Sequence, residues 1–374
     1  MKTPQNPFIL SGYTGKEWFC NREKELTDLL AHIENERNVV LYAWRRLGKT
    51  ALIKCLFDEL EKTGEMETVY VDLFATQSVT EALEAITSAI YEKYGSTSTG
   101  LSSALQMLFS SIGVSIRFNE MTGAPEIFFA LRQPPRPEPS FAAIGKFLAD
   151  RKKTVVIALD EFQQLTSYVD KHCEALFRNW MQEFPSTRFI YSGSHRKIMF
   201  SMFSEKNRPF FQSSQLMSVD PIHVDDYSAF IIEHFKKNGK TITTDITQKI
   251  YHWCRGQTYS IQRVCNYLFG HYSHPGPDDL TEVFEQIIEQ DKPMFASYQK
   301  MLTRSQWSVL KAVAAEEPLK NPLSKEFLIK YSLGAASSVQ TALQALQKKE
   351  IVVEEHGSYF VHDVILARWL QTIT

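Results

Sequence analysis

A strand-like apolar run that passes directly into a Gly-Lys-Thr loop and then a helix is the feature that most restricts the fold of this chain. Residues 38–50 read Asn-Val-Val-Leu-Tyr-Ala-Trp-Arg-Arg-Leu-Gly-Lys-Thr, and helix-like residues follow. A strand, a loop with inward amide N–H groups and a helix N-terminus together bind phosphate. In such a loop Lys49 reaches the β and γ phosphates, and the Thr50 hydroxyl holds Mg²⁺. The segment therefore predicts a nucleoside triphosphate as ligand.

The phosphate-loop pattern G-x-x-x-x-G-K-[ST] departs from consensus at its first position, where this chain has Ala43. Alanine is strained at positive φ where glycine is not, so we expect the loop to begin with an ordinary backbone angle. Gly-Lys-Thr alone also fits a surface turn between a strand and a helix, and context has to exclude that alternative. The residues expected around the phosphates are Ala43, Trp44, Arg45, Arg46, Leu47, Gly48, Lys49, Thr50 and Ala51.

A second motif ends in two adjacent carboxylates, Asp160 and Glu161, after the mostly apolar residues 154–159. Such a run is typical of a strand buried on both faces of a parallel sheet, and ligands bind outside the carboxyl ends of such strands. Asp160 is predicted to bind Mg²⁺ through water. Glu161 is predicted to polarise the attacking water as general base, with Lys49 as the second catalytic residue. The alternative is a strand that ends in a solvated acidic turn.

Composition places the chain among ordinary globular proteins. It has 374 residues, 44% hydrophobic and 22% charged, which is enough for two or three domains. The net charge of −2 gives no bulk attraction to nucleic acid or anionic membrane. Five scattered cysteines without metal-ligand spacing indicate reduced thiols in a cytoplasmic protein. The N-terminal residues lack the apolar core of a signal peptide, and no apolar run has membrane-spanning length.

The arrangement of the chain predicts an α/β fold followed by two smaller parts. Strand-like and helix-like stretches alternate from residue 22 to 222, which predicts a phosphate-loop (P-loop) NTPase domain over residues 1–222 with a parallel sheet flanked by helices. Residues 95–140 look like a two-stranded insertion at the edge of the sheet. Residues 223–293 carry helical spacing and predict a helical lid subdomain. Residues 294–374 read as three helices and a hairpin, which is a winged helix.

Taken together, these motifs resemble a known family. The chain is similar to the archaeal-type ATPases found in archaea and in Bacteroidetes, a branch of the STAND class of P-loop ATPases and distant kin of AAA proteins. The resemblance runs almost end to end, and the family tolerates a residue other than glycine where Ala43 stands. It rests on Asn6-Pro7-Phe8, Phe19-Cys20-Asn21-Arg22-Glu23, Arg45-Arg46-Leu47-Gly48-Lys49-Thr50, Val71-Asp72-Leu73, Leu159-Asp160-Glu161-Phe162, Ser192-Gly193-Ser194, Arg208-Pro209-Phe210, residues 256–262 and the terminal winged helix.

The resemblance implies roles that the motifs alone do not. Phe19 and Arg22 look like part of the element that lines the adenine side of the pocket. A helix N-cap at Asn21, with Glu23 in the first turn, is the alternative there, and the two interpretations are compatible. Ser192 or Ser194 stands where related ATPases place a polar sensor of the γ-phosphate, against the alternative of a serine-rich turn. Many relatives carry an arginine after Pro-Phe-Tyr, whereas here Phe210-Phe211 leads to Gln212. Arg196 or Arg208 is then the candidate arginine finger, against the alternative of a solvated arginine.

The leading hypothesis is an ATP-binding and ATP-hydrolysing switch that uses Mg²⁺, in which the nucleotide state changes the packing of the lid and winged helix. A partner protein or effector, which the sequence does not identify, reads that change, and oligomerisation is compatible with the sequence. A second hypothesis is a DNA-binding ATPase. However, the candidate recognition helix over residues 335–350 has no arginine, and residues 301–374 hold eight Lys/Arg against seven Asp/Glu. A small-molecule kinase and a nucleotide-binding module without turnover are the remaining alternatives.

Overall fold

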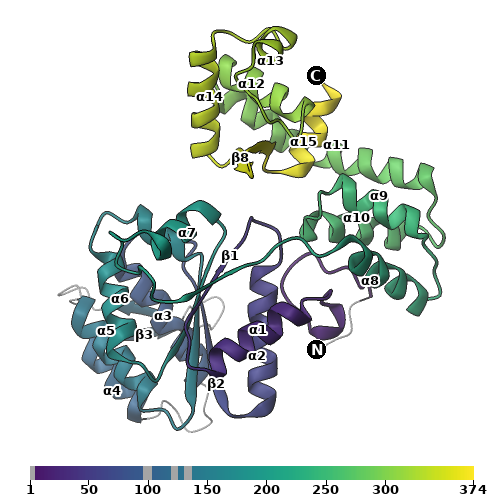
Figure 1. Cartoon of the computed structure of the whole chain (residues 1–374). Coiled ribbons are helices and arrows are strands. Elements are labelled where there is room, and N and C mark those ends of the chain that lie inside the picture. The colour runs from purple at the N-terminus through teal and green to yellow at the C-terminus, as the bar shows by residue number, and fades with distance from the viewer. Residues whose placement is uncertain (1–4, 96–102, 119–124, 130–136) are drawn as a thin grey trace. The chain divides into compact units, whose positions relative to one another are not determined.

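The computed structural model describes residues 5–95, 103–118, 125–129 and 137–374, and the chain folds into two compact units (Figure 1). The first unit is Gly12–Asp220. The second unit is Pro221–Thr374 together with residues 5–11 at the start of the chain. Each unit has its own hydrophobic core and is described by itself.

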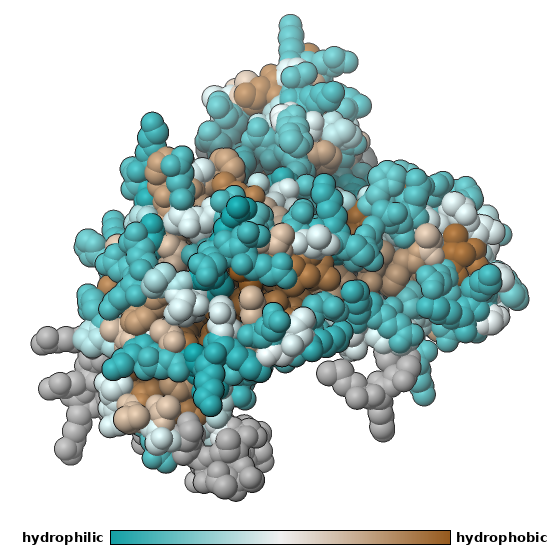
Figure 2. Space-filling model, turned by 60° about the horizontal axis from the view of Figure 1, so that its bottom comes forward, coloured by the Kyte–Doolittle hydropathy of each residue, from teal (hydrophilic) through white to brown (hydrophobic). Residues whose placement is uncertain are grey.

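Polar side chains cover much of the surface. On the face shown in Figure 2, hydrophilic residues predominate and hydrophobic residues gather in smaller patches between them. Within the described residues, no helix is long and apolar enough to cross a membrane.

A five-stranded parallel sheet forms the centre of the first unit. Its strand order is β2-β5-β6-β1-β7, and every pairing is parallel. The predicted α/β class with a parallel sheet is therefore confirmed. Because β6 lies between β1 and β5, the carboxyl ends of β1, β5 and β6 are neighbours at one edge of the sheet. The strands are β1 (Val39–Tyr42), β2 (Met66–Asp72), β5 (Thr154–Asp160), β6 (Arg188–Gly193) and β7 (Gln215–Ser218).

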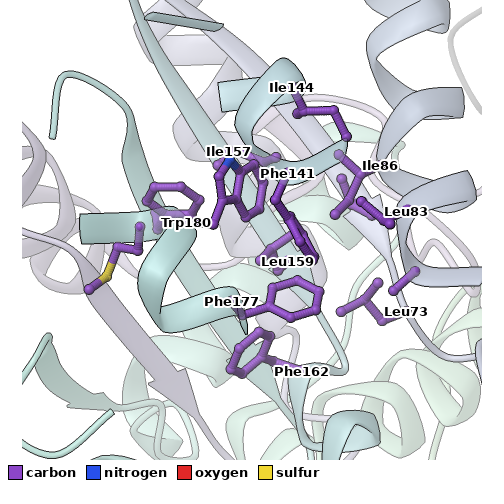
Figure 3. Close-up of a cluster of buried hydrophobic side chains, with 14 of the residues drawn as sticks. Leu73, Leu83, Ile86, Phe141, Ile144, Ile157, Leu159, Phe162, Phe177 and Trp180 are labelled. Atoms are coloured by element: carbon purple, nitrogen blue, oxygen red, sulfur yellow. The ribbon is translucent and has the colours of Figure 1, made fainter. Parts of the chain in front are cut away.

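Alternate residues of β5 enter two different hydrophobic clusters, one on each face of the sheet. Ile157 and Leu159 pack with aromatic side chains such as Phe141 and Trp180 (Figure 3), whereas Val156 and Ala158 pack on the opposite face. Burial on both faces explains why this strand is apolar throughout. The first face is covered by α3 (Val79–Tyr94), α4 (Ser103–Ile112), α5 (Pro137–Ala149), α6 (Cys173–Glu183) and α7 (Arg196–Ser204), and the second by α1 (Glu23–Glu34) and α2 (Lys49–Thr63).

The predicted insertion contains a short antiparallel pair, as expected. Strand β3 (Val114–Phe118) pairs with β4 (Pro125–Phe129) in a separate two-stranded sheet. The turn predicted between them and the Pro-rich stretch at 134–136 lie outside the described residues. Helix α4 before β3 was not predicted. The described part of this unit also has two 3-10 helices, η1 (Lys16–Trp18) and η2 (Phe162–Ser167).

The second unit begins with four helices that form the helical subdomain. The N-terminal residues pack here, because Phe8 is fully buried beside Phe235 and Phe269, and Asn266 Nδ2 donates to Phe8 O at 2.8 Å. The predicted first domain began at residue 1, so residues 5–11 lie in a different unit from the one expected. The helices are α8 (Val224–Lys237), α9 (Thr244–Trp253), α10 (Thr258–His271) and α11 (Pro277–Met301).

Helix α11 continues through Pro293, so the boundary predicted at residue 293 between the lid subdomain and the winged helix lies inside a helix. Proline removes one backbone donor, but the buried side chains of Ile287 and Phe295 on either side hold the helix in place. The winged helix then has the predicted three helices and hairpin. It also ends in a helix that was not predicted. Its elements are α12 (Arg304–Ala315), α13 (Lys325–Lys330), α14 (Ala336–Lys348), β8 (Val352–Glu355), β9 (Ser358–Val361) and α15 (Val364–Thr372).

Candidate active site

The loop between β1 and α2 has the backbone that phosphate binding requires. Lys49 is the first residue of α2, so the loop ends at a helix N-terminus, where amide N–H groups attract anions. Gly48 at φ 87° and Arg46 at φ 69° take left-handed angles, whereas Ala43 does not. The expectation of an ordinary angle at Ala43 is confirmed. The residues of this loop with left-handed backbone angles come after Ala43, at Arg46 and Gly48.

The two residues predicted to hold Mg²⁺ lie together, although 110 positions separate them in sequence. Thr50 Oγ1 donates to Asp160 Oδ2 at 2.8 Å, and Tyr70 OH donates to the same oxygen at 2.7 Å. Asp160 Oδ1 accepts from Glu161 N at 3.0 Å. The carboxylate is therefore held from three places: α2, β2 and the residue that follows its own strand.

The donor set fits a hard cation such as Mg²⁺, which takes one or two protein oxygens and completes its shell with water and phosphate. The described residues contain no group of three His, Cys, Asp or Glu side chains that could hold a metal ion without such help. Thr50 and Asp160 would hold Mg²⁺ here, and the cation would supply charge neutralisation for the phosphates.

Burial and neighbouring charges act in opposite directions on the ionisable groups of the site. Burial lowers the pKa of Lys49, while Glu161 and Asp160 raise it. Burial, and then the Asp160 carboxylate, raise the pKa of Tyr70, so the phenol stays a donor to Asp160. Burial also raises the pKa of Asp72, with Asp160 and Glu161 adding to the shift. Asp72 pairs in register with Asp160 across β2 and β5, which explains the repulsion.

Glu161 stands at the end of β5 with a left-handed backbone, φ 53°. Its Oε2 accepts from Ser194 Oγ at 2.7 Å and from Gln163 Nε2. Ser194 follows β6 and is 2% exposed, and Arg45 Nε of the phosphate loop donates to its hydroxyl at 3.3 Å. Of the two serines proposed as sensors, Ser194 therefore reaches the site. Ser192 is fully buried and its hydroxyl makes no hydrogen bond within the described residues.

The N-terminal element meets the phosphate loop through Arg22. The side chain is buried, its Nη2 donates to Leu47 O at 3.2 Å, and its Nη1 pairs with Glu25. Phe19 is half-buried and packs against Tyr13, with ring centroids 6.0 Å apart. The alternative of an N-cap at Asn21 is wrong: Arg22 occupies the cap position in a left-handed conformation, and the Asn21 side chain instead accepts from Arg22 N.

The two arginines considered as arginine fingers are both paired. Arg208 Nη2 lies 2.7 Å from Glu174 Oε1, and Glu174 is 9% exposed. Arg196 lies 3.5 Å from Asp220 and over the Tyr42 ring. The pairing of Arg208 with a buried carboxylate gives it a structural contact inside the unit.

Sequence reasoning missed Gln163, Tyr70 and Asp72 as members of the site. Tyr70 and Asp72 alternate on β2, and β2 pairs with β5, which ends in Asp160. Knowledge of the strand order would therefore have placed them in the site. Gln163 had no signal of its own, because its contact depends on the left-handed turn at Glu161.

Comparison with known proteins places the chain in a family. Residues 19–264 match a family described as an ATPase domain predominantly from Archaea. The chain belongs to this ATPase family. Residues 293–372 match a family described as a probable winged helix domain. The expected resemblance to archaeal-type ATPases with a terminal winged helix, the P-loop ATPase fold and the assignment as an ATPase are thereby confirmed.

Solved structures share the fold of the ATPase at low sequence identity. The Walker-type ATPase paby2304 of Pyrococcus abyssi superposes with a TM-score of 0.68 and 18% identity, covering 98% of this chain and 99% of that chain. The Aeropyrum pernix ORC2 protein, solved in ADPNP-ADP complexes, gives 0.61 and 14%, covering 98% and 96%. The Aeropyrum pernix ORC1 protein in complex with DNA gives 0.55 and 13%, with the same coverage. No curated protein matches the chain.

Proposed function

We propose that this ATPase is a molecular switch of the STAND/AAA-like type, which binds ATP with Mg²⁺ and hydrolyses it slowly. The nucleotide state controls how the helical lid subdomain and the winged helix pack on the ATPase core, and a partner protein reads that packing. The observation that carries the proposal is the hydrogen bond of 2.8 Å between Thr50 and Asp160, with Glu161 as the next residue.

Each side chain has a defined task in this proposal. Lys49, at the N-terminus of α2, attracts the β and γ phosphates, and the neighbouring backbone amides add to its charge. Thr50 and Asp160 orient Mg²⁺. Glu161 accepts the proton of the water that attacks the γ-phosphorus, as the new P–O bond forms and the bond to the ADP oxygen breaks. Arg22 stiffens the loop by holding Leu47 O.

Phosphate release and ATP binding, measured separately on the full chain, test this proposal. Lys49→Ala is expected to abolish binding of ATP. Glu161→Gln is expected to keep ATP bound and to reduce turnover by at least about 100-fold, since general-base catalysis contributes that much. Glu17→Gln, outside the site, is the control. Unchanged turnover in the Lys49 and Glu161 variants would contradict the proposal, and binding without turnover in the unmodified chain would favour a nucleotide-binding module.

A DNA-binding ATPase remains the second candidate. The solved complex of Aeropyrum pernix ORC1 with DNA favours it, because that protein shares the fold. The exposed residues of α14 are mostly neutral: Ala336, Ser337, Ser338, Gln340, Thr341 and Gln344, with Lys348 and Lys349 where the helix ends. Such a surface offers few phosphate contacts, so any DNA binding should have a shallow salt dependence. A gel shift of the full chain on duplex DNA at two salt concentrations, with and without ATP, decides between the candidates.

A further inference from the structure

Gln163 is the one buried amide that touches the carboxylate of Glu161 among the described residues. It lies in η2, two residues after Glu161, and is 9% exposed. Its Nε2 donates to Glu161 Oε2 and also lies 3.4 Å from Ser194 Oγ. Ser194 donates to the same carboxylate oxygen at 2.7 Å. Two donors from separate elements therefore converge on one oxygen of Glu161, and no donor within the described residues reaches its Oε1.

The end of β6 leaves room for this amide. A Cβ atom added to Gly193 would lie 2.4 Å from Gln163 Oε1, so only glycine at that position admits the observed side-chain placement. Gln163 Oε1 is buried and has no hydrogen-bond partner within the described residues. An unsatisfied buried acceptor destabilises a fold, and such groups in native proteins often have a functional reason.

The strained backbone of Glu161 is a second observation that points to a role for Gln163. A non-glycine residue in the left-handed region is costly and persists only where surrounding contacts over-determine it. Glu161 at φ 53° is held on one side by Gln163 and Ser194, and on the other by its own N–H, which donates to Asp160 Oδ1 at 3.0 Å. The turn directs the carboxylate toward the end of β6 and the Ser194 hydroxyl.

We propose that Gln163 is a positioning residue for Glu161: with Ser194 it holds Oε2, so that Oε1 is presented to the attacking water. The proposal rests on the role of Glu161 as general base. The hydrogen bonds around Glu161 also reach the phosphate loop, because Arg45 Nε donates to Ser194 Oγ at 3.3 Å. The contacts of the Gln163 amide are to Glu161 and Ser194, so Gln163 acts on the reaction through Glu161, and its removal should lower turnover and leave ATP affinity unchanged.

Gln163→Met in the full chain tests this, because methionine keeps the length of the side chain and lacks both amide groups. Loss of a hydrogen bond to a charged group predicts a kcat about 10- to 100-fold lower, with the Kd for ATP within about 2-fold of the unmodified chain. The matched control is Gln164→Met. Gln164 Nε2 donates to Phe74 O at 2.9 Å, away from Glu161, so this variant should turn over normally. If Gln163→Met does not fold, Gln163→Leu is likewise uncharged and lacks the donor, with the same expectation.

A double-mutant cycle separates positioning from a general structural effect. In the Glu161→Gln background, Gln163→Met should cost no further activity, because both residues act through one carboxylate. If the two substitutions together lower turnover by the product of their separate effects, the proposal is overturned. A higher Kd for ATP or an unchanged kcat in Gln163→Met would also overturn it. The proposed base is tested by Glu161→Gln alone. If that variant turns over normally, the base assignment fails; if it is inactive and Gln163→Met is normal, only the role of Gln163 fails.

Discussion

A buried ion pair inside the second unit allows a quantitative prediction. Arg255, after α9 of the helical subdomain, donates from Nη1 to Glu317 Oε2 at 3.0 Å, and Glu317 follows α12 of the winged helix. Glu317 Oε1 also accepts from Val361 N, and Arg255 Nη2 donates to Val361 O at 2.6 Å. Burial raises the pKa of Glu317 and lowers that of Arg255, and each partner opposes the shift of the other. Both groups are therefore desolvated and depend on each other.

Glu317→Ala leaves the Arg255 guanidinium buried without its counter-charge. Removal of one partner from a buried ion pair costs roughly 3–5 kcal/mol. The Arg255 side chain keeps 21% of its surface exposed and retains Val361 O as acceptor, which favours the lower limit. We therefore expect a loss of about 3 kcal/mol, or roughly a 150-fold increase in local opening.

Hydrogen exchange of the full chain, read in peptides from β9 and α15, measures that opening directly. The matched control is Glu316→Ala, the neighbouring carboxylate, which pairs with Lys330 at the surface and should change exchange little. Arg255→Met combined with Glu317→Ala should recover much of the loss, because the Arg255 charge is removed together with its hydrogen-bonded partner. Exchange in Glu317→Ala no faster than in Glu316→Ala would refute the reasoning, and so would a double variant less stable than the single one.

Two further predictions concern the site. Tyr70→Phe removes a donor to Asp160 Oδ2, so the Mg²⁺ concentration needed for half-maximal Mg²⁺-dependent ATP binding should rise roughly 10-fold, while binding without Mg²⁺ stays unchanged in calorimetry. A Tyr70→Phe variant with wild-type Mg²⁺ dependence would exclude this role for the phenol. Arg22→Lys lacks the second guanidinium arm that reaches Leu47 O, so ATP affinity should fall about 10-fold with an unchanged circular dichroism spectrum. Equal affinity would mean that the loop does not depend on Arg22.

The parts of the fold predictable from sequence are those set by local periodicity and chain order. Strand β5 was recognisable because both of its faces are buried, which makes Val155–Leu159 apolar without alternation. The meeting of Thr50 and Asp160 followed from the general rule that parallel strands present ligands at their carboxyl ends. The two-stranded insertion and the winged helix followed from turns and helical spacing.

Features set by single backbone angles or by distant packing were not predictable. The left-handed angles at Arg22 and Glu161 determine where these side chains reach, and no residue pattern marks them. Asn21 has the side chain of a good N-cap, yet it bonds to Arg22 N, and the cap position passes to Arg22. Residues 5–11 pack on a helical subdomain more than 200 positions away, as the 258-residue separation between Phe8 and Asn266 shows. The local sequence of residues 5–11 does not indicate which distant helices they pack against.

The contacts of Arg255 also constrain how the proposed switch can act. A second arginine, Arg368 of α15, donates from Nε to Trp253 O at 3.0 Å, and Gln257 Nε2 donates to His362 O at 2.9 Å. The loop that follows α9 is thus held by the winged helix at several points. We infer that the helical subdomain and the winged helix move as one body when the nucleotide changes, because breaking this junction would expose the buried pair.

Distance measurements between dye labels test that inference on the full chain. The five native cysteines are all buried, so cysteines introduced at exposed positions react selectively. Dyes at Ala229→Cys in α8 and Gln340→Cys in α14 both lie within the second unit. The efficiency of fluorescence resonance energy transfer between them should be the same with ATP and ADP. A pair at Lys152→Cys and Gln340→Cys joins the two units, and its efficiency should change if nucleotide controls their packing. A change within the second unit contradicts rigid coupling, whereas no change in either pair contradicts the switch itself.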